Sequence, residues 1–338
     1  MEYSLAGRWL NQSIEINAVA NFIASVQKTD GEIPWSDGDK TDPWDHVEAA
    51  MGLSVGGYLN EAYLAYIWMA SSQNKDGSWY ASYRNGVAED LTRDANFSAY
   101  IAVGVWHYFL ITGDTNFLRL MWPCVKAAIR FTLSLQAPEG NIYWALNRDG
   151  QLDPMSLLTG SSSIHFSLQC ALAIASVLDE KQSEWRTASD RLKYAIQHKP
   201  HNFNMTKSRY AMDWFYPILS GAVTGVAAKR RLFKSWKRFI VEGQGVKCVS
   251  DRPWVTIAET AELVLTLAAM GSDNLAAIIL GWVTDKKYDN GSYWCGYTWP
   301  DMVIWPEEKI AWTNAAVLLA ADAVYRLTPA CHLFRHPE

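Results

Sequence analysis

The sequence Gln27-Lys28-Thr29-Asp30-Gly31-Glu32-Ile33-Pro34-Trp35 follows a segment of helical periodicity and is the first of four related turns. The others occupy residues 73–79, 136–144 and 289–294, and each has a glycine next to an acidic residue or an asparagine, followed by an aromatic residue. The glycine permits a left-handed end to the preceding helix, and the aromatic residue can pack back on the helical hairpin. The repeat therefore predicts a fold built from helical hairpins.

Helical periodicity continues along the 338-residue chain, whereas the alternation typical of β-strands is nearly absent. The pattern predicts about twelve helices, over residues 14–27, 45–58, 60–72, 95–112, 115–135, 160–178, 182–196, 208–221, 225–239, 255–270, 272–284 and 309–327. The spacing of the turns resembles the QW-like repeats of the α/α-toroid superfamily, which includes terpene cyclases, protein prenyltransferase β-subunits and many glycosidases. The resemblance implies an all-α (α/α)6 toroid of six hairpins. We predict that residues 1–338 form it as a single domain.

The composition argues against several classes of partner. The net charge is −5, whereas a nucleic-acid-binding protein requires a basic face. No run of about 18 apolar residues is present, so no membrane span is predicted, and no signal peptide is recognised. The five cysteines are scattered, which indicates neither a disulfide framework nor a zinc site. We expect a soluble cytoplasmic protein whose oligomeric state stays open.

A dense polar cluster opens the second predicted helix, in the stretch Asp42-Pro43-Trp44-Asp45-His46-Val47-Glu48. Pro43 suits a first helical turn, and Asp42 before it can cap the free backbone N–H groups. The helix dipole also favours negative charge at this end. The cluster is therefore either an ordinary helix cap or part of a catalytic site.

The other even-numbered helices also open with polar clusters, whereas odd-numbered helices begin with plainer sequences such as Asn60-Glu61-Ala62-Tyr63. In a toroid, alternate helices form the inner ring, and the loops that enter them share one rim. If the even-numbered helices are inner, their polar residues meet at one site. We therefore predict substrate-binding roles for Trp35, Trp44, His46, Asp94, Asn96, Tyr100, Ser162, His165, Asp213, Trp214, Asp251, Arg252, Trp254, Trp294 and Trp312.

Glycoside hydrolysis needs two carboxyl groups that face each other across a bound sugar. One is protonated and acts as acid, and the other activates water or attacks carbon. An otherwise apolar helix carries Glu259 and Glu262, and burial there would raise the pKa of a carboxyl group as a general acid requires. The alternative for these glutamates is an ion pair with an arginine such as Arg252. The predicted catalytic residues are Asp42, Asp45, Glu48, Glu259 and Glu262.

Two other functions are compatible with a toroid. The 17 Trp and 16 Tyr suit isoprenoids or cations as well as sugar faces, and some of them fill the core. A prenyltransferase or terpene cyclase is therefore one alternative, although DxDD and DDxxD motifs are absent. Cys248 and Asp251 also lack a third zinc ligand at the spacing of that family. A non-catalytic saccharide-binding protein is the other alternative.

Four strings resemble a finer group, at residues 42–51, 158–163, 211–217 and 248–262. They are similar to bacterial toroid proteins often labelled prenyltransferase, and to the mycobacterial hydrolases of methylmannose polysaccharides. The resemblance implies an endo-acting glycosidase, inverting if the carboxylates are widely spaced, with acids at Asp42, Asp45 and Glu259 or Glu262. Many relatives are expected to have asparagine at the position of Asp45.

The predicted function is hydrolysis of an intracellular oligosaccharide or polysaccharide, for example an α-mannoside. We predict that the reaction needs no metal ion and no cofactor. The expected partner is the saccharide substrate, with no nucleic acid and no membrane.

Overall fold

The computed structural model describes residues 14–337. Within this range each of the twelve predicted helices is present, and its ends differ from the predicted ones by at most three residues. The predicted helix 95–112 consists of two helices that meet at Tyr100, α5 (Ala95–Ala99) and α6 (Ile101–Thr112). None of the described helices is long and apolar enough to cross a membrane. The signal-peptide prediction concerns a segment that begins with residues 1–13, which lie outside the described residues.

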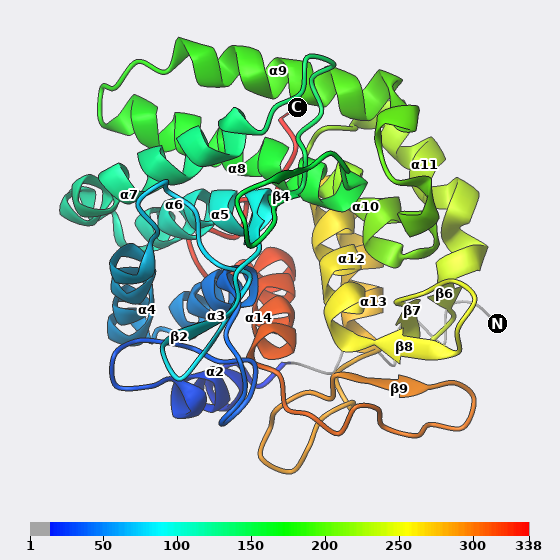
Figure 1. The fold of residues 1–338 in the computed structure, drawn as a ribbon. Coiled ribbons are helices and arrows are strands. Elements are labelled where there is room, and N and C mark those ends of the chain that lie inside the picture. The colour runs from blue at the N-terminus through cyan, green and yellow to red at the C-terminus, as the bar shows by residue number, and fades with distance from the viewer. Residues whose placement is uncertain (1–13, 338) are drawn as a thin grey trace.

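Six helical segments have more than half of their residues buried and form the inner set. They are α3 (Pro43–Val55), α5 with α6, α8 (Leu158–Val177), α10 (Ala211–Leu219), α12 (Ile257–Ala269) and α14 (Ala311–Tyr325). Every residue of α12 is buried, as is every residue of α3 except Asp45. Contacts run from α3 through α6, α8, α10 and α12 to α14, and α14 packs against α3 again (Figure 1). The inner helices therefore form a closed cycle.

The outer helices each have at most half of their residues buried. They are α2 (Ile16–Val26), α4 (Leu59–Ser72), α7 (Thr115–Ser134), α9 (Ser183–His198), α11 (Gly225–Phe239) and α13 (Asp273–Gly281). Each packs on the inner helix beside it in the chain, and α2 packs on both α3 and α14. Most of the basic side chains of α11 face solvent, as an amphipathic outer helix requires. One continuous cluster of buried apolar side chains extends from Ile14 to Ala321.

The glutamine that begins each of the first three repeated turns joins neighbouring outer helices. The side-chain amide of Gln27 donates to the carbonyl oxygens of Gly31 in its own turn, at 3.1 Å, and of Glu61 in α4, at 2.9 Å. Gln73 bonds in the same way to its own turn and to α7, and Gln136 does so to its turn and to α9. The glycine of each turn lies against the same outer helix that the glutamine reaches. The repeat therefore sets how successive hairpins pack.

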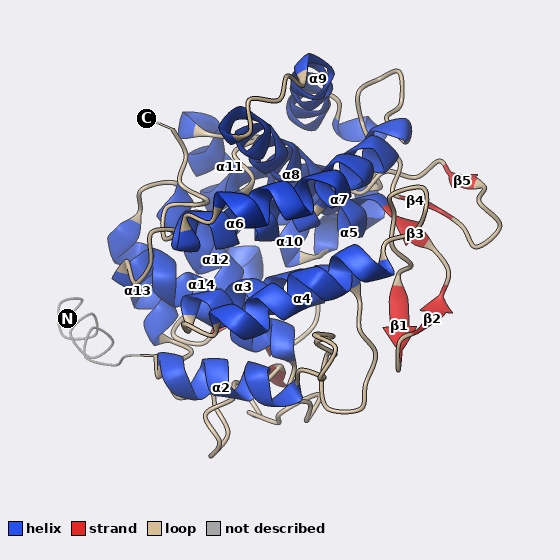
Figure 2. Ribbon diagram, turned by 90° about the vertical axis from the view of Figure 1, so that its left-hand side faces the viewer, coloured by secondary structure: helices blue, strands red, loops and turns tan. Residues whose placement is uncertain are grey.

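The prediction of an all-α chain needs one correction, because the described residues include nine short strands. They are β1 (Ser82–Arg84), β2 (Val87–Asp90), β3 (Arg93–Asp94), β4 (Ala145–Leu146), β5 (Leu152–Asp153), β6 (Ile240–Val241), β7 (Gly245–Lys247), β8 (Trp254–Thr256) and β9 (Gly296–Thr298). They pair antiparallel in the orders β1-β2, β3-β4-β5 and β6-β7-β8-β9. Figure 2 shows β1 to β5 at the edge of the helical body. Strands of two to four residues are too short to show a period-two pattern, which is why sequence periodicity missed them.

We expect Gly77→Ala to destabilise the fold more than Gly57→Ala does. Both glycines have positive φ, +92° and +82°, so alanine at either position costs roughly 1–2 kcal/mol of backbone strain. A Cβ on Gly77 would lie 2.2 Å from the carbonyl oxygen of Ala127 in α7, whereas nothing lies within 4 Å of one on Gly57. Urea unfolding should show a further loss of about 1–3 kcal/mol for Gly77→Ala. Equal losses for the two variants would contradict the close packing of the turn on α7.

Candidate active site

Asp42 caps the N-terminus of α3, as the sequence predicted. One carboxylate oxygen accepts the backbone N–H of Asp45 at 2.9 Å, and the other accepts the indole N–H of Trp35. The ammonium group of Lys40 lies 4.1 Å from the centre of the Trp35 ring. Asp42 is buried, and burial raises its pKa despite these donors. Both of its oxygens are thus engaged in holding the entry to the helix.

Glu48 lies further along α3 and is fixed by two indoles. Oε2 accepts the N–H of Trp44 and the N–H of Trp312, each at 2.8 Å, and Trp312 belongs to the first turn of α14. These donors favour the carboxylate, but Glu48 is only 1% exposed, and burial raises its pKa to about 7. Glu48 therefore links two neighbouring inner helices and can hold a proton near neutral pH.

Glu262 faces this cluster from α12. Oε1 accepts the hydroxyl of Tyr216 in α10 at 2.7 Å, whereas Oε2 is buried and has no hydrogen-bond partner among the described residues. Burial raises the pKa of Glu262 well above the usual value, and the negative charges of Glu48 and Glu259 raise it further. A carboxyl group in this setting holds its proton more tightly than an exposed glutamate does, and one of its oxygens has no partner in the described part of the protein.

The carboxylate of Asp45 has no hydrogen-bond or ion-pair partner among the described residues. Asp45 lies in the first turn of α3 and is partly exposed. Burial of its carboxylate raises the pKa well above the usual value, and the charges of Asp42, Glu48 and Glu262 add to the shift.

The acids of α3 and α12 occur at the same spacing, since three residues separate Asp45 from Glu48 and Glu259 from Glu262. Residues three apart share a helix face, so each helix presents a pair of acids. Glu259 is buried, as is Glu262. Because Arg252 is exposed and both glutamates are buried, the alternative ion pair with Arg252 is not formed.

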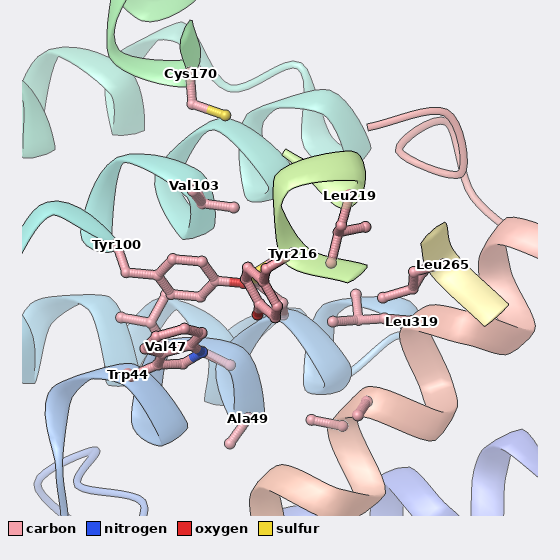
Figure 3. Close-up of a cluster of buried hydrophobic side chains, with 14 of the residues drawn as sticks. Trp44, Val47, Ala49, Tyr100, Val103, Cys170, Tyr216, Leu219, Leu265 and Leu319 are labelled. Carbon is pink, nitrogen blue, oxygen red and sulfur yellow. The ribbon is translucent and has the colours of Figure 1, made fainter. Parts of the chain in front are cut away.

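Three aromatic rings pack together in the middle of the inner helices. The ring centre of Trp44 lies 5.1 Å from that of Tyr100 in a stacked arrangement and 5.7 Å from that of Tyr216. Figure 3 shows these rings close together, with Val47 and Leu319 among the aliphatic side chains around them. The cluster supports Trp44, which donates to Glu48, and Tyr216, which donates to Glu262. It thereby helps to fix the positions of both carboxyl groups.

A cavity of about 260 Å³ adjoins Trp44 and is lined by Asp94 and Asn96, both predicted as substrate-binding residues. Asp94 caps α5 by accepting the backbone N–H groups of Asn96 and Phe97, at 2.7 and 3.0 Å. Burial raises the pKa of Asp94 to about 7, and the negative charge of Asp42 contributes. The structure therefore brings the entries of α3 and α5 together.

The two predicted histidines make internal hydrogen bonds. Nδ1 of His46 accepts the backbone N–H of Ile33 at 3.0 Å, and its Nε2 donates to the carbonyl oxygen of Ala65 at 2.9 Å. Nδ1 of His165 bonds to the hydroxyl of Ser189 at 3.0 Å. Burial lowers the pKa of each ring to about 4, so both are neutral at physiological pH. Their substrate-binding role stays a prediction.

Ser162 and Asp213 also bond within the protein. The hydroxyl of Ser162 donates to the carbonyl oxygen of Leu158 at 2.7 Å. Asp213 accepts both the hydroxyl and the backbone N–H of Thr159, at 2.6 and 3.1 Å, which joins the entries of α8 and α10. These contacts order the loops that lead into the inner helices.

The remaining predicted residues lie in or beside the sheet β6–β9, namely Asp251, Arg252, Trp254 and Trp294. Asp251 forms an exposed ion pair with Arg209 at 2.9 Å, and the indole of Trp254 donates to the carbonyl oxygen of Trp305 at 2.8 Å. No group of three or more His, Cys, Asp and Glu side chains within residues 14–337 is arranged to hold a metal ion.

Some residues at the site were not selected from the sequence. Tyr216 bonds to Glu262, and Trp144 and Ser161 line the cavity. The aromatic that ends each repeated turn was a signal for Trp144, although the repeat alone indicated only packing. Trp214, which was selected, stacks on Phe239 of α11 with ring centres 5.0 Å apart and lies on the outer side of α10.

Two pairs of acids on α3 and α12, beside aromatic rings, are the chemical equipment of a glycoside hydrolase. No protein-family model matches the chain. The chain is 48% identical over 316 residues to the MMP endo-(1,4)-3-O-methyl-alpha-D-mannosidase of Mycolicibacterium hassiacum, with 94% of this chain and 88% of that protein covered. The chain belongs to this family of glycoside hydrolases, which confirms the predicted class of enzyme.

Solved structures show that glycosidases share the fold. The wild-type structure of a protein named glycosidase matches with a TM-score of 0.70 at 14% identity, covering 93% of this chain and 97% of that one. The GH63 mannosylglycerate hydrolase from Thermus thermophilus, in complex with Tris and D-glycerate, matches with a TM-score of 0.71 at 11% identity, covering 90% and 99%. At such low identity the match concerns the fold alone.

We expect the stability of Glu48→Gln relative to the wild type to rise with pH. The pKa of Glu48 is about 7 in the folded protein and 4.5 in an unperturbed glutamate, so the folded state binds the proton more tightly. This contribution is fully present below about pH 4.5 and is lost as the pH rises through about 7. Glutamine has no such proton, so in urea unfolding the variant should gain about 3 kcal/mol relative to the wild type between pH 4 and pH 8.

The exposed Glu184 offers a matched control, because an exposed Glu→Gln substitution away from the site should change stability little. A difference between Glu48→Gln and wild type that does not vary with pH would contradict a proton held on Glu48.

Proposed function

We propose that this chain is an endo-acting, inverting mannosidase that cleaves (1,4) linkages in polysaccharides of 3-O-methyl-α-D-mannose. The observation that carries the proposal is its 48% identity, over 94% of the chain, to an enzyme named for that activity. The opposed acids of α3 and α12 supply the groups that such a reaction requires.

In this proposal Glu262 is the general acid. The group has a strongly raised pKa and one unpartnered oxygen, and the hydroxyl of Tyr216 fixes its other oxygen. Glu262 would give its proton to the glycosidic oxygen as the bond to C1 breaks, so that the leaving sugar departs as an alcohol.

Asp45 is the proposed general base. It is partly exposed and unpartnered, so a water molecule can reach it, whereas hydrogen bonds hold Asp42 and Glu48 in place. Protonation of Glu262 removes one negative charge from the cluster and thereby favours the ionised form of Asp45. The ionised Asp45 would take a proton from water as the water oxygen attacks C1 from the face opposite the leaving group.

We also propose an architecture and a cellular location for the enzyme. The closed cycle of inner helices supports a single (α/α)6 toroid, with the acids at the N-terminal ends of α3 and α12. The acid and base are both side chains of this chain, which supports a reaction that needs no metal ion. All five cysteines are free, as expected in a reducing compartment, which supports a cytoplasmic enzyme acting on an intracellular polysaccharide.

We expect Glu262→Gln and Asp45→Asn each to lower kcat/KM for methylmannose oligosaccharides by roughly 10²–10⁴-fold, because each removes one proton-transfer group. Asp42→Asn should have a smaller effect, since asparagine also caps a helix. The exposed acids Glu184 and Asp289 provide controls, and Glu184→Gln and Asp289→Asn should retain wild-type rates. A larger loss in Asp42→Asn than in Asp45→Asn would move the role of base to Asp42.

The first product released from an α-linked substrate should be the β-anomer, because water attacks opposite the leaving group. Proton NMR of the anomeric signal during the first minutes of hydrolysis would show this before the anomers equilibrate. Initial accumulation of the α-anomer would instead indicate a covalent intermediate and a nucleophilic role for Asp45.

A further inference from the structure

Another cavity lies between α8, α9 and the C-terminal segment. Its volume is about 320 Å³, within the range of roughly 300–1,000 Å³ typical of small-molecule sites. Its lining includes Ser220 and Gly221, which follow the C-terminal end of α10. His336 also lines it and donates its backbone N–H to the carbonyl oxygen of Ala269, the last residue of α12. The cavity therefore adjoins the opposite end of α12 from Glu259, which lies in the first turn.

The lining includes a buried histidine, His165, which is 3% exposed. The side-chain amide of Gln169 donates to the hydroxyl of Ser189 at 2.7 Å, and that hydroxyl lies 3.0 Å from Nδ1 of His165. Because Ser189 accepts from Gln169, its own hydrogen is left for Nδ1, and the ring hydrogen of His165 is then on Nε2. Nε2 has no hydrogen-bond partner among the described residues and is not fully enclosed by the protein. Since buried donors are nearly always paired, this open N–H indicates a ligand or water in the cavity.

Two cations of α9 flank this imidazole. Arg186 and Lys193 both line the cavity, and they lie two helical turns apart on one face of the helix. Ser189 lies between them in the chain and contacts His165, which places the imidazole between the two cations. Neither cation forms an ion pair or hydrogen bond among residues 14–337, and Lys193 is half-buried. The site therefore offers two unpaired positive charges and one N–H donor.

The charge that the cavity presents is positive, although the exposed Asp190 also lines it. Burial lowers the pKa of His165 to about 4, with a contribution from the positive charge of Lys193. Burial also lowers the pKa of His336, and Lys193 contributes there as well. Asp190 raises the pKa of neither ring. The two imidazoles therefore sense the cation rather than the acid, and an anion in the cavity would meet an attractive field.

We infer that this cavity binds a small phosphate monoester, such as a phosphorylated monosaccharide. The guanidinium of Arg186 can bind two phosphate oxygens, and the ammonium of Lys193 and the N–H of His165 can bind the phosphate as well. A monoester carries a charge of about −1.5 to −2 at pH 7, which the two cations match. The volume leaves room for a sugar whose hydroxyls bond to Asp190. The site is separate from the acids of α3 and α12 and does not depend on the proposed mannosidase activity.

Calorimetry of the full chain with glucose 6-phosphate tests the site, with glucose as the uncharged comparison. We expect the phosphate ester to bind at least about tenfold more tightly than glucose, because hydrogen bonds to charged groups are the stronger ones. Lys193→Met removes the charge and keeps a long side chain, and it should weaken binding by about tenfold or more. Lys237→Met is the matched control, because Lys237 is an exposed cation of α11 that does not line this cavity. It should bind as the wild type does.

Two further variants separate an anion from an uncharged ligand. Asp190→Asn removes the one acid of the lining and should tighten binding of glucose 6-phosphate by about 2–5-fold. Arg186→Met changes an exposed residue, so the fold is retained, and it should weaken binding as Lys193→Met does. Equal affinities for glucose 6-phosphate and glucose, no loss of affinity in Lys193→Met, or weaker binding in Asp190→Asn would overturn the inference.

NMR of the imidazole nitrogens, in protein labelled at histidine, locates the ligand. The free protein should show His165 with its hydrogen on Nε2, and the signal of that nitrogen should move on addition of glucose 6-phosphate. The same addition to Lys193→Met should leave the signal in place. Binding of the ester that does not move the His165 signal would assign it to another site and overturn the inference. A wild type that cleaves no α-mannoside would remove the proposed function and leave these measurements unchanged.

Discussion

The glutamine side-chain amide that bonds both to its own turn and to the next outer helix is the contact on which the arrangement of hairpins depends. Gln27, Gln73 and Gln136 make this pair of bonds four residues before a glycine. In the fourth turn Lys287 takes the place of glutamine and pairs with Glu15 at the start of α2. The last outer helix is thereby joined to the first, and the cycle of inner helices closes with it.

This arrangement explains why so many acids lie together. Each inner helix enters the protein from a polar loop, and the entries meet because the hairpins repeat with one geometry. The positive ends of the α3 and α12 dipoles favour the negative charges of Asp45 and Glu259 in their first turns. Glu48 and Glu262 lie deeper, and the cost of burying them appears as their raised pKa values; such destabilisation is expected where it serves chemistry.

Local sequence was sufficient for the helices, the cap at Asp42 and the paired acids of α3 and α12, because periodicity and spacing fix these features. Local sequence could not show which side chains near the start of an inner helix point toward the site. Trp214 and Trp144 both lie near inner-helix entries, yet Trp214 packs outward on α11 and Trp144 lines the cavity. That choice depends on the angle at which each loop meets the neighbouring hairpin, which no short stretch of sequence encodes. The short strands were missed for a different reason, since two to four residues are too few to show an alternating pattern.

In this site, the polar groups that have hydrogen-bond partners support the structure, and the groups without partners are the candidates for chemistry. Asp42 and Glu48 are held by indole and backbone donors, so their carboxylates are fixed in position. One oxygen of Glu262 is buried without a hydrogen-bond partner among the described residues, whereas the other accepts the hydroxyl of Tyr216. A buried polar group without a partner costs stability. Such a cost is expected where a group is kept for chemistry rather than for the fold, which is why Glu262 is the group that we assign to proton transfer.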